Sequence, residues 1–521
     1  MVLRILLSAA FLLSAAPAQA GAAPETASAP ELPDLGEPAA APAGAPPTVA
    51  LVTRQLLQQH AYWLADDARR GRYTGSTAQQ ETAEYVAAQF ERLGLAPDGD
   101  KGGWFQWYPI EQLVLHDSTG ITVDDVDITD VAVLPATGTK RVSASGRLVW
   151  CGGGRGDELP GTLKGRIPVV VLTAPPRGSG PSADLGAIQI YTGVARQLAR
   201  LDAKVGVVVL PGDPGSYGNT LNYRGLLPDH PLQSVGGDGR GVDLSIPLIV
   251  VAGGPAMPLL RAVGATIADN GAVTGPTEEP KATAKVRIRI DTVKKGKASN
   301  VVGVLQGGSR KQEALVISAH HDHIGRRIDG DAFNGADDNA SGTAGLLALA
   351  EALAKGGEPP ARSIVFLSVS GEELGLWGSA WYADHPSWPL DRIVANVNID
   401  MIGRAVKSGP GCEVQITPSF QHAKYSSLGR LAAQLAPRFD ITFTSGDTYY
   451  ERSDHYNFAQ KGVPVVFLCD GEHPDYHQVT DHADKLDYTS MEAIARLLCW
   501  TAWEVADGKD RPKELGRQTE W

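Results

Sequence analysis

The chain has 521 residues and a formal net charge of −12, with 20% charged and 43% hydrophobic residues. A chain of this length is too long for one compact core, so we expect two domains together with terminal segments. The composition is ordinary for a globular protein. The negative net charge and the lack of a long basic run argue against nucleic acid as a partner.

The N-terminus has the pattern of an export signal. Arg4 supplies a positive start, the stretch Ile5–Ala16 is apolar, and Ala18-Gln19-Ala20 is a small-x-small cleavage site. The apolar run is too short to span a bilayer comfortably. We therefore expect residues 1–20 to be a signal peptide and the mature protein to be periplasmic or secreted, with no integral membrane segment. Residues 21–48, rich in Ala and Pro, predict a flexible linker.

Helical periodicity follows the linker, over Val52–Arg69 and again over Thr77–Leu93. From residue 131 to 275 the texture changes, because short Val/Ile/Leu runs alternate there with Gly/Pro turns. This texture predicts a β-rich domain with few catalytic residue types. The block interrupts the sequence around it, so we expect an inserted domain at 131–275 within a discontinuous domain of residues 49–130 and 276–510.

From Ser299 onward, predicted strands alternate with predicted helices. The strands are near-continuous apolar runs, as expected of parallel strands covered on both faces. They are Val301–Leu305, Ala314–Ser318, Ser363–Leu367, Val394–Ile399 and Val463–Leu468, and the helices are Gly342–Ala354, Leu374–His385, Tyr425–Leu435 and Thr489–Ala506. This alternation predicts an α/β fold, a three-layer sandwich with a central, mostly parallel mixed sheet flanked by helices.

Five candidate metal ligands lie in the same half of the chain: His320, Asp337, Glu373, Asp400 and His477. All except Asp337 follow a predicted strand, where ligands of such sheets gather. Each motif alone is more typical of a polar loop or a helix start. Together, two imidazoles and three carboxylates suit two Zn²⁺ ions that share one carboxylate. The set therefore predicts a hydrolytic di-zinc centre.

The motifs around these residues resemble the co-catalytic zinc aminopeptidases, whose superfamily includes glutamate carboxypeptidases and glutaminyl cyclases. The resemblance is carried by residues 318–325, 335–342, 371–378, 397–403, 452–458 and 476–481. The block at 131–275 is similar, in position and texture, to the protease-associated domain that many members carry at this place. The resemblance implies an enzyme that removes N-terminal residues from peptides, and the signal pattern predicts that it is exported.

The resemblance also implies a role for each ligand. Asp337 would bridge the two zinc ions, His320 and Asp400 would complete one site, and Glu373 and His477 would complete the other.

The resemblance makes Glu372 the general base, which would take a proton from the zinc-bound water and pass it to the leaving amine. Tyr476 matches a tyrosine that stabilises the oxyanion in some members. Four further carboxylates would act in the outer shell: Asp322 would orient His320, Asp338 would help to hold a strained peptide geometry beside the bridging residue, and Asp454 and Asp481 would lie further out.

The other histidines are not expected to bind zinc. His321 should point away from His320 if the pleat of the strand continues, and His323 is expected to line the site without binding metal. His455 is expected in the outer shell or in a pocket wall. The remaining histidines are expected in packing or surface positions: His60, His116, His230, His385, His422, His473 and His482.

The four cysteines match no zinc or redox motif. A Cys412–Cys469 disulfide is allowed in an exported protein, and buried free thiols at these positions and at Cys151 and Cys499 are the alternative.

Three readings of the function are compatible with the sequence. The first is aminopeptidase action on peptides with a free N-terminus. A carboxypeptidase for small acidic peptides would use the same centre and would need an arginine cluster, for which Arg404 and Arg452 are candidates. Glutaminyl cyclisation is less favoured, because Glu372 and the paired ligands favour hydrolysis. A non-catalytic binding protein is the third reading, although relatives of that kind have lost ligands and this chain keeps all five.

Overall fold

The computed structural model describes residues 32–173, 181–228, 230–234, 243–268, 272–405 and 411–521. The expected signal peptide, residues 1–20, and the first part of the expected linker lie outside the described residues. One compact unit begins at Leu35 and continues to Trp521. Among the described residues, no helix is long and apolar enough to cross a membrane.

Residues 35–48 differ from the expected flexible linker, because they pack on the compact unit. Leu35 and Ala45 lie against the main hydrophobic core. The Glu492 carboxylate accepts a hydrogen bond from the Ala39 N–H at 3.2 Å, and the Arg496 guanidinium donates to the Ala39 carbonyl at 2.6 Å. A segment poor in large apolar residues is thus fixed mainly through its backbone polar groups.

The C-terminal half contains a mixed sheet, hereafter the C-terminal sheet, whose strand order is β13-β15-β14-β16-β19-β17-β18. Strands β15, β14, β16 and β19 are mutually parallel, whereas β13 and β17 are antiparallel to their neighbours β15 and β19. The bounds are β13 (Thr283–Leu305), β14 (Ala314–His320), β15 (Ser363–Val369), β16 (Ile393–Ile399), β17 (Glu413–Thr417), β18 (Thr442–Ser445) and β19 (Val465–Cys469), with the short β1 (Ala96–Pro97) paired to β13.

Helices cover both faces of this sheet, which confirms the predicted three-layer sandwich. One face carries α1 (Pro47–Leu51), α2 (Arg54–Leu64), α3 (Thr77–Arg92), α7 (Gly342–Lys355), α9 (Ser427–Leu435) and α11 (Tyr488–Asp507). The other face packs against α8 (Trp377–Asp384) and α10 (His455–Gln460) through Tyr382 and Phe458. All residues of β14, β15 and β16 are buried, which explains their unalternating apolar sequences. Burial of a leucine side chain, such as that of Leu346 in α7, contributes about 1.5–3 kcal/mol to the free energy of unfolding.

A second sheet has the strand order β4-β3-β13-β6-β7-β8-β10-β5. Its strands are β3 (Gly120–Val123), β4 (Val126–Ile128), β5 (Ala132–Leu134), β6 (Arg141–Trp150), β7 (Arg166–Val171), β8 (Gly206–Leu210) and β10 (Leu248–Ala252). The core on one face includes α4 (Pro181–Arg200) and α5 (Gly215–Arg224), and the core on the other includes α6 (Met257–Ala262). We call residues 116–289 the inserted unit; it is wider than the expected 131–275 because β3, β4 and the first half of β13 belong to it.

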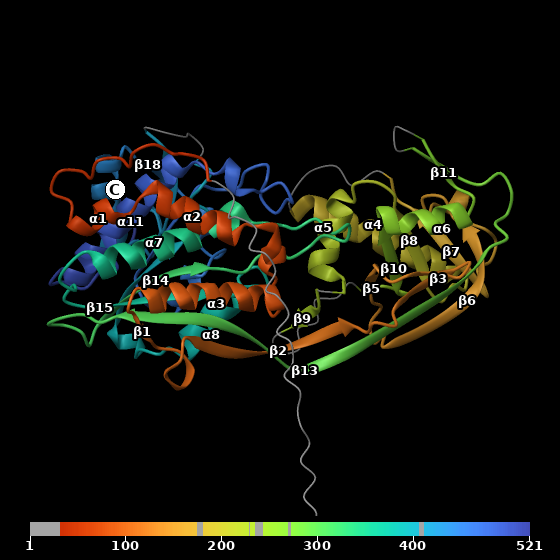
Figure 1. Cartoon of the computed structure of the whole chain (residues 1–521), viewed down its shortest axis with the longest axis horizontal. Coiled ribbons are helices and arrows are strands. Elements are labelled where there is room, and N and C mark those ends of the chain that lie inside the picture. Colours follow the sequence, from red (N-terminus) through yellow and green to blue (C-terminus); the bar gives the residue numbers. More distant parts are fainter. Residues whose placement is uncertain (1–31, 174–180, 229, 235–242, 269–271, 406–410) are drawn as a thin grey trace, which may run out of the picture. The chain divides into compact units, whose positions relative to one another are not determined.

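Strand β13 runs from one sheet into the other (Figure 1). Strand β2 (Phe105–Leu115) pairs with β13 along residues 290–301, with one irregularity between Val293 and Gly296. The strand predicted at Val301–Leu305 is the end of the longer strand β13. The inserted unit is therefore connected through a paired ladder of strands. Short β9 (Leu232–Ser234) adds to β2, and β11 (Thr266–Ile267) pairs with β12 (Val273–Thr274).

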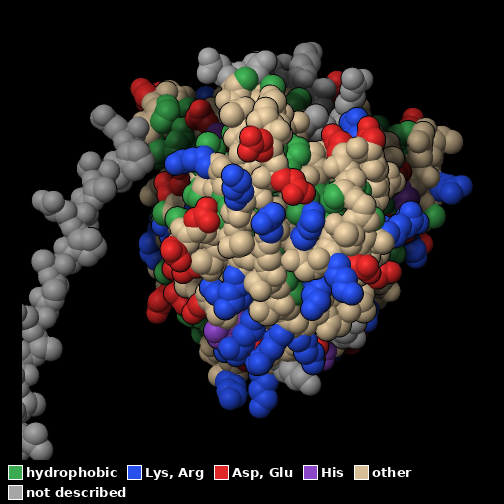
Figure 2. Space-filling model, turned by 90° about the vertical axis from the view of Figure 1, so that its right-hand side faces the viewer, with side chains coloured by type: hydrophobic (Ala, Val, Ile, Leu, Met, Phe, Trp, Pro, Cys, Tyr) green, Lys and Arg blue, Asp and Glu red, His purple; other side chains and the backbone are tan. Residues whose placement is uncertain are grey.

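Lysine and arginine side chains gather on the side of the molecule drawn in Figure 2. Strands β6 and β13 contribute to such a surface, because Arg141 pairs with Arg289 across the ladder, and Arg147, Lys285 and Arg287 follow at alternating positions of the same two strands. This local excess of positive charge contrasts with the net charge of −12 of the whole chain.

All four cysteines lie in described parts of the chain, and each is a buried free thiol. The structure thus has the alternative that the sequence left open, rather than a Cys412–Cys469 disulfide.

Candidate metal centre

The candidate ligands meet at one edge of the C-terminal sheet, where its parallel strands end. His320 is the last residue of β14, Asp400 directly follows β16, and Glu372 and Glu373 lie just beyond β15. His477 lies in the long loop after β19. The carboxyl ends of neighbouring parallel strands reach the same edge of a sheet, so these side chains converge although they are far apart in sequence.

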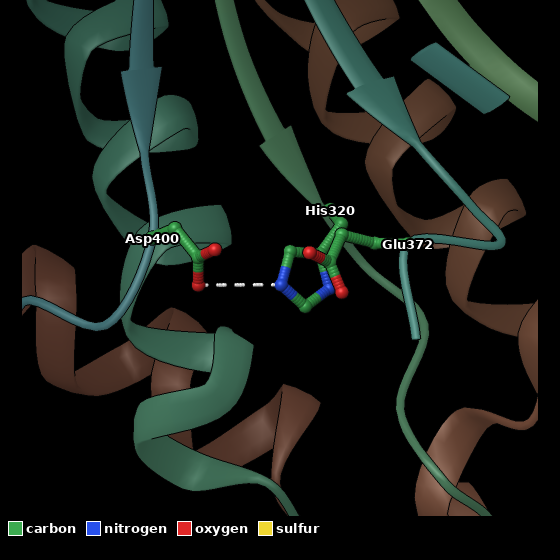
Figure 3. A group of neighbouring side chains, drawn as sticks. All are labelled: His320, Glu372 and Asp400. Atoms are coloured by element: carbon green, nitrogen blue, oxygen red, sulfur yellow. Dashed lines mark hydrogen bonds and ion pairs between the residues drawn. The ribbon is translucent and has the colours of Figure 1, made fainter. Parts of the chain in front are cut away.

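The first group of ligands surrounds the His320 imidazole. Its Nε2 lies 3.2 Å from Asp400 Oδ1 and 3.3 Å from Asp338 Oδ1. Potential ligand atoms of His320, Glu372 and Asp400 all lie within 4.8 Å of one another. Figure 3 shows the Asp400 carboxylate facing the imidazole ring, with Glu372 beside the ring.

The second group surrounds the Glu373 carboxylate. His477 Nε2 lies 3.2 Å from Glu373 Oε2 and 3.0 Å from Asp338 Oδ2. The Nδ1 atom of His323 lies 2.6 Å from Glu373 Oε1. Asp338 therefore presents one oxygen to each group, which is the arrangement of a carboxylate shared by two metal ions.

This arrangement corrects the expected bridging residue from Asp337 to its neighbour Asp338. Asp337 is fully buried but faces elsewhere: its Oδ1 accepts a hydrogen bond from the Gly403 N–H at 2.7 Å, and its Oδ2 lies 3.2 Å from His473 Nε2. The two aspartates are adjacent in a non-helical stretch, so their side chains diverge. The peptide bond that follows, Asp338–Asn339, is cis. His473, expected in a packing or surface position, is instead a neighbour of Asp337.

The loop that carries Asp338 is held by buried hydrogen bonds. The Asp481 carboxylate accepts from the N–H groups of Asp337 at 2.9 Å and Asp338 at 3.4 Å. The Asn339 side chain donates to the Ile399 carbonyl and accepts from the Met401 N–H. Asp481 thus acts on Asp338 through the backbone, and Asn339 ties the loop to the end of β16.

The first imidazole is oriented from its other nitrogen. His320 Nδ1 lies 3.2 Å from the backbone carbonyl of Asp322 and 3.7 Å from its carboxylate. A proton on Nδ1 leaves the Nε2 lone pair directed at Asp338 and Asp400. The Asp322 carboxylate is itself fixed by the Thr74 hydroxyl at 2.7 Å. Asp322 therefore lies where an orienting group is expected, with its carbonyl as the nearer acceptor.

The family to which this region belongs follows from a direct comparison. Residues 300–502 match the model of peptidase family M28. This stretch is a peptidase M28 domain. It contains all five candidate ligands of the corrected set, in which Asp338 replaces Asp337. The helices and strands described above place these ligands at one edge of its sheet.

Relatives of the M28 domain carry several activities. The aminopeptidase YwaD of Bacillus subtilis (strain 168) is 26% identical over 251 residues, which cover 46% of this chain and 51% of that protein. A protein named probable glutamate carboxypeptidase LAMP1, from Arabidopsis thaliana, is 29% identical over 242 residues, covering 40% of this chain and 32% of that protein. The chain spans about half the length of the first of these relatives and less of the second.

The fold is similar to that of a solved structure, described as BSAP, a zinc aminopeptidase from Bacillus subtilis. The TM-score is 0.56 at 19% identity, and the match covers 88% of this chain and 96% of that chain. The likeness extends well beyond residues 300–502, and at this identity it concerns the fold alone.

Burial shifts the pKa of several groups at the M28 centre. Burial raises the pKa of Glu372 well above its ordinary value, and nearby Asp400 and Asp454 raise it further, against an opposing effect of His320. Burial likewise raises the pKa of Tyr476 well above its ordinary value, so that its phenol keeps its proton. Burial also raises the pKa of Asp454.

The donor set fits a pair of divalent zinc ions. The Nε2 atom of His323 is buried without a hydrogen-bond partner among the described residues, and its Nδ1 atom lies 2.6 Å from Glu373 Oε1. Such orphaned polar atoms are costly unless a cation compensates them. Imidazole nitrogens and carboxylate oxygens are the mixed donors that Zn²⁺ accepts. His320, Asp400 and Asp338 would hold one ion, and His477, Glu373 and Asp338 would hold the other.

A small pocket of about 40 Å³ opens on the centre. It is lined by Asp338, Glu372, Asp400, Met401, Tyr449, Arg452, Phe467, Cys469, Glu472 and Tyr476. Arg452 lies in an ion pair with Glu472 at 2.8 Å, and Arg404 pairs with Asp475 at 3.0 Å. Both arginines are therefore already matched by carboxylates of the chain.

Two contributions to the site were missed from the sequence. The buried Arg72 guanidinium donates to the carbonyls of Asn334, Gly335 and His321, which holds the segments on both sides of the centre. Burial lowers its pKa to about 10. Nothing in the local sequence separates Arg72 from the exposed Arg70.

The second missed contribution comes from the inserted unit. The Tyr223 hydroxyl of α5 lies 2.7 Å from His477 Nδ1, and the Asn219 side chain donates to the His477 carbonyl at 3.3 Å. The outer nitrogen of a candidate ligand is thus contacted by a residue about 250 positions earlier in the chain.

His321 points away from the centre, as expected, towards Gln79 and Ser368 at 2.9 Å each.

Proposed function

We propose that the protein is an exported di-zinc aminopeptidase that hydrolyses the N-terminal residue from peptides. The observation that carries the proposal is the Asp338 carboxylate, whose two oxygens face two separate groups of ligands, with Glu372 adjacent to the first group. When bound, a pair of zinc ions supplies Lewis acidity for the peptide carbonyl and lowers the pKa of a water molecule towards neutrality.

Glu372 is placed to move the proton in this reaction. Its carboxylate lies within reach of the first group of ligands, while its neighbour Glu373 faces the second group. Glu372 would take a proton from the attacking water and deliver it to the leaving amine. The neutral Tyr476 phenol, which lines the same pocket, would donate a hydrogen bond to the oxyanion.

The pocket does not present an unpaired arginine to a substrate carboxylate. Among the described residues that line it, the cationic side chain is Arg452. A carboxypeptidase for acidic peptides would need unpaired arginines, whereas Arg404 and Arg452 already pair with Asp475 and Glu472.

Two further parts of the proposal concern the rest of the chain. We propose that residues 1–20 direct export, on the signal pattern of the sequence, and that the inserted unit is a protease-associated domain, on its position and its β-rich composition.

The proposal is tested by hydrolysis of a panel of amino-acid p-nitroanilides, with N-acetylated substrates as the control. Release should require the free amine, stop with a chelator and return with added zinc. Glu372→Gln should lower kcat by about 10²–10⁴-fold, with two zinc ions per chain still bound by elemental analysis. The matched control is Glu358→Gln at an exposed position, which should keep full activity. Wild-type turnover by Glu372→Gln would exclude the base role, and activity that survives exhaustive chelation would exclude the metal mechanism.

A further inference from the structure

His323 lies inside the second group of ligands, although the sequence places it outside the expected set. Potential ligand atoms of His323, Asp338 and Glu373 all lie within 4.8 Å of one another. The His323 and His477 rings meet edge to face, with centroids 5.7 Å apart, on either side of the Glu373 carboxylate. The two oxygens of Glu373 therefore face two different imidazoles.

The backbone around His323 fixes the position of this ring. The His323 N–H donates to the Arg72 carbonyl at 3.3 Å. Across the site, Gly335 adopts φ +52, and a Cβ at that position would lie 2.5 Å from the Cγ and Cδ2 atoms of His323. Only a glycine leaves room for the ring there, so the imidazole is packed against the loop that carries Asp338.

One ring nitrogen of His323 has no partner in the part of the chain that the structure describes. His323 is fully buried, and its Nε2 atom has no hydrogen-bond partner among the described residues. Its Nδ1 atom faces the Glu373 carboxylate at 2.6 Å, the separation of two groups that can share a metal ion. An unsatisfied buried polar group costs about 1–3 kcal/mol. Buried His321 differs, because both of its ring nitrogens are bonded.

We infer that His323 is a ligand of the second metal ion, together with His477, Glu373 and Asp338. The inference rests on the proposed di-zinc function and makes the two sites unequal. The second ion has four protein ligands, as in closed structural zinc sites, while the first has three, His320, Asp400 and Asp338, and keeps an open position beside Glu372. The second ion should therefore bind more tightly and be released last.

The test is competitive zinc titration of the full chain against a chromophoric chelator, together with a crystal structure of the zinc complex recorded with anomalous scattering. The wild type should bind two zinc ions with unequal affinity, and a His323 ring nitrogen should lie about 2.0–2.1 Å from the second ion. His323→Gln should weaken the tighter site by more than the roughly 10–100-fold typical of an outer contact. His323→Cys, which supplies another zinc ligand, should restore much of the loss.

The matched control is His321→Gln, which changes an equally buried neighbour that faces away from the metals, and circular dichroism checks the folding of each variant. Unchanged zinc affinity in a folded His323→Gln, or a ring nitrogen more than about 3 Å from both ions, overturns the inference. If the wild type then remains a chelator-sensitive peptidase with two zinc ions, only the role of His323 is lost. A wild type that binds no zinc overturns the proposed function as well.

Discussion

Replacement of Tyr223 by phenylalanine should weaken the second metal site from a distance. The Tyr223 hydroxyl lies 2.7 Å from His477 Nδ1, while Nε2 of the same ring faces Asp338 and Glu373. For Nε2 to bind metal, the proton must be on Nδ1, so the imidazole donates and the Tyr223 oxygen accepts. Tyr223→Phe keeps the ring beside His477, at a centroid distance of 5.9 Å, and removes this acceptor.

The expected magnitude follows from the loss of one outer hydrogen bond to a metal ligand. Such losses lower metal affinity by roughly 10–100-fold, which corresponds to about 1.4–2.8 kcal/mol. The effect should fall on the second ion, because His320, in the first group, is oriented by Asp322 instead. The assay is the same chelator competition, with thermal unfolding of the metal-free protein recorded beside it. The metal-free proteins should melt alike, and the zinc-loaded variant should melt at a lower temperature than the wild type.

Tyr191→Phe is the matched control within the inserted unit. Its hydroxyl donates to the Tyr217 carbonyl at 3.3 Å, inside the helical core of that unit. If Tyr191→Phe weakens zinc binding as much as Tyr223→Phe does, the effect is a general loosening of the inserted unit. Two zinc ions held with wild-type affinity by Tyr223→Phe would refute the orienting role of this tyrosine.

Two further predictions concern stability. Burial lowers the pKa of His60 to about 4, so the unfolded chain takes up its proton first and the free energy of unfolding falls as the pH drops from about 6.5 to about 4. In urea unfolding, His60→Gln should reduce the dependence of the free energy of unfolding on pH by up to about 1.4 kcal/mol per pH unit. Equal pH dependence of the wild type and of His60→Gln would contradict the assignment. Glu313→Gln should lower the free energy of unfolding by about 2 kcal/mol, because Glu313 contacts the buried Arg362 at 2.5 Å. Burial raises the pKa of Glu313, but hydrogen bonds from Arg362 and Arg511 outweigh this effect and lower the pKa. The contribution of the ion pair is therefore present at neutral pH and should vanish on acidification. An equal loss for Glu313→Gln at neutral and at acidic pH would contradict this assignment.

The architecture of the M28 domain could be predicted because its signals are local and redundant. Continuous apolar runs mark β14, β15 and β16, and a polar residue where each strand ends marks the edge at which ligands meet. The ends of β14 and β16 were placed well enough to identify His320 and Asp400. Identifying these two residues requires only the position at which each strand ends, and not the direction of a side chain.

The errors at the site come from side-chain direction and from distant partners. Asp337 and Asp338 are chemically identical neighbours, and only the local backbone decides which one faces the metals. The position of His323 beside Glu373 could not be predicted either, because a strand pleat gives no direction to a residue three positions beyond the strand end. Arg72 and Tyr223 reach the centre across about 250 residues of sequence, and no local pattern reports such contacts.

The paired strands β2 and β13 determine how the inserted unit could be removed. A domain joined by loops can be cut out at the loops, but here the joint is a paired ladder from Phe105↔Val301 to Leu115↔Ile290, with one irregularity. A shortened chain would have to close this ladder as a β-hairpin, with a tight turn replacing everything beyond the chosen pair. It would also lose Tyr223, so Nδ1 of the candidate ligand His477 would have to bond to water instead.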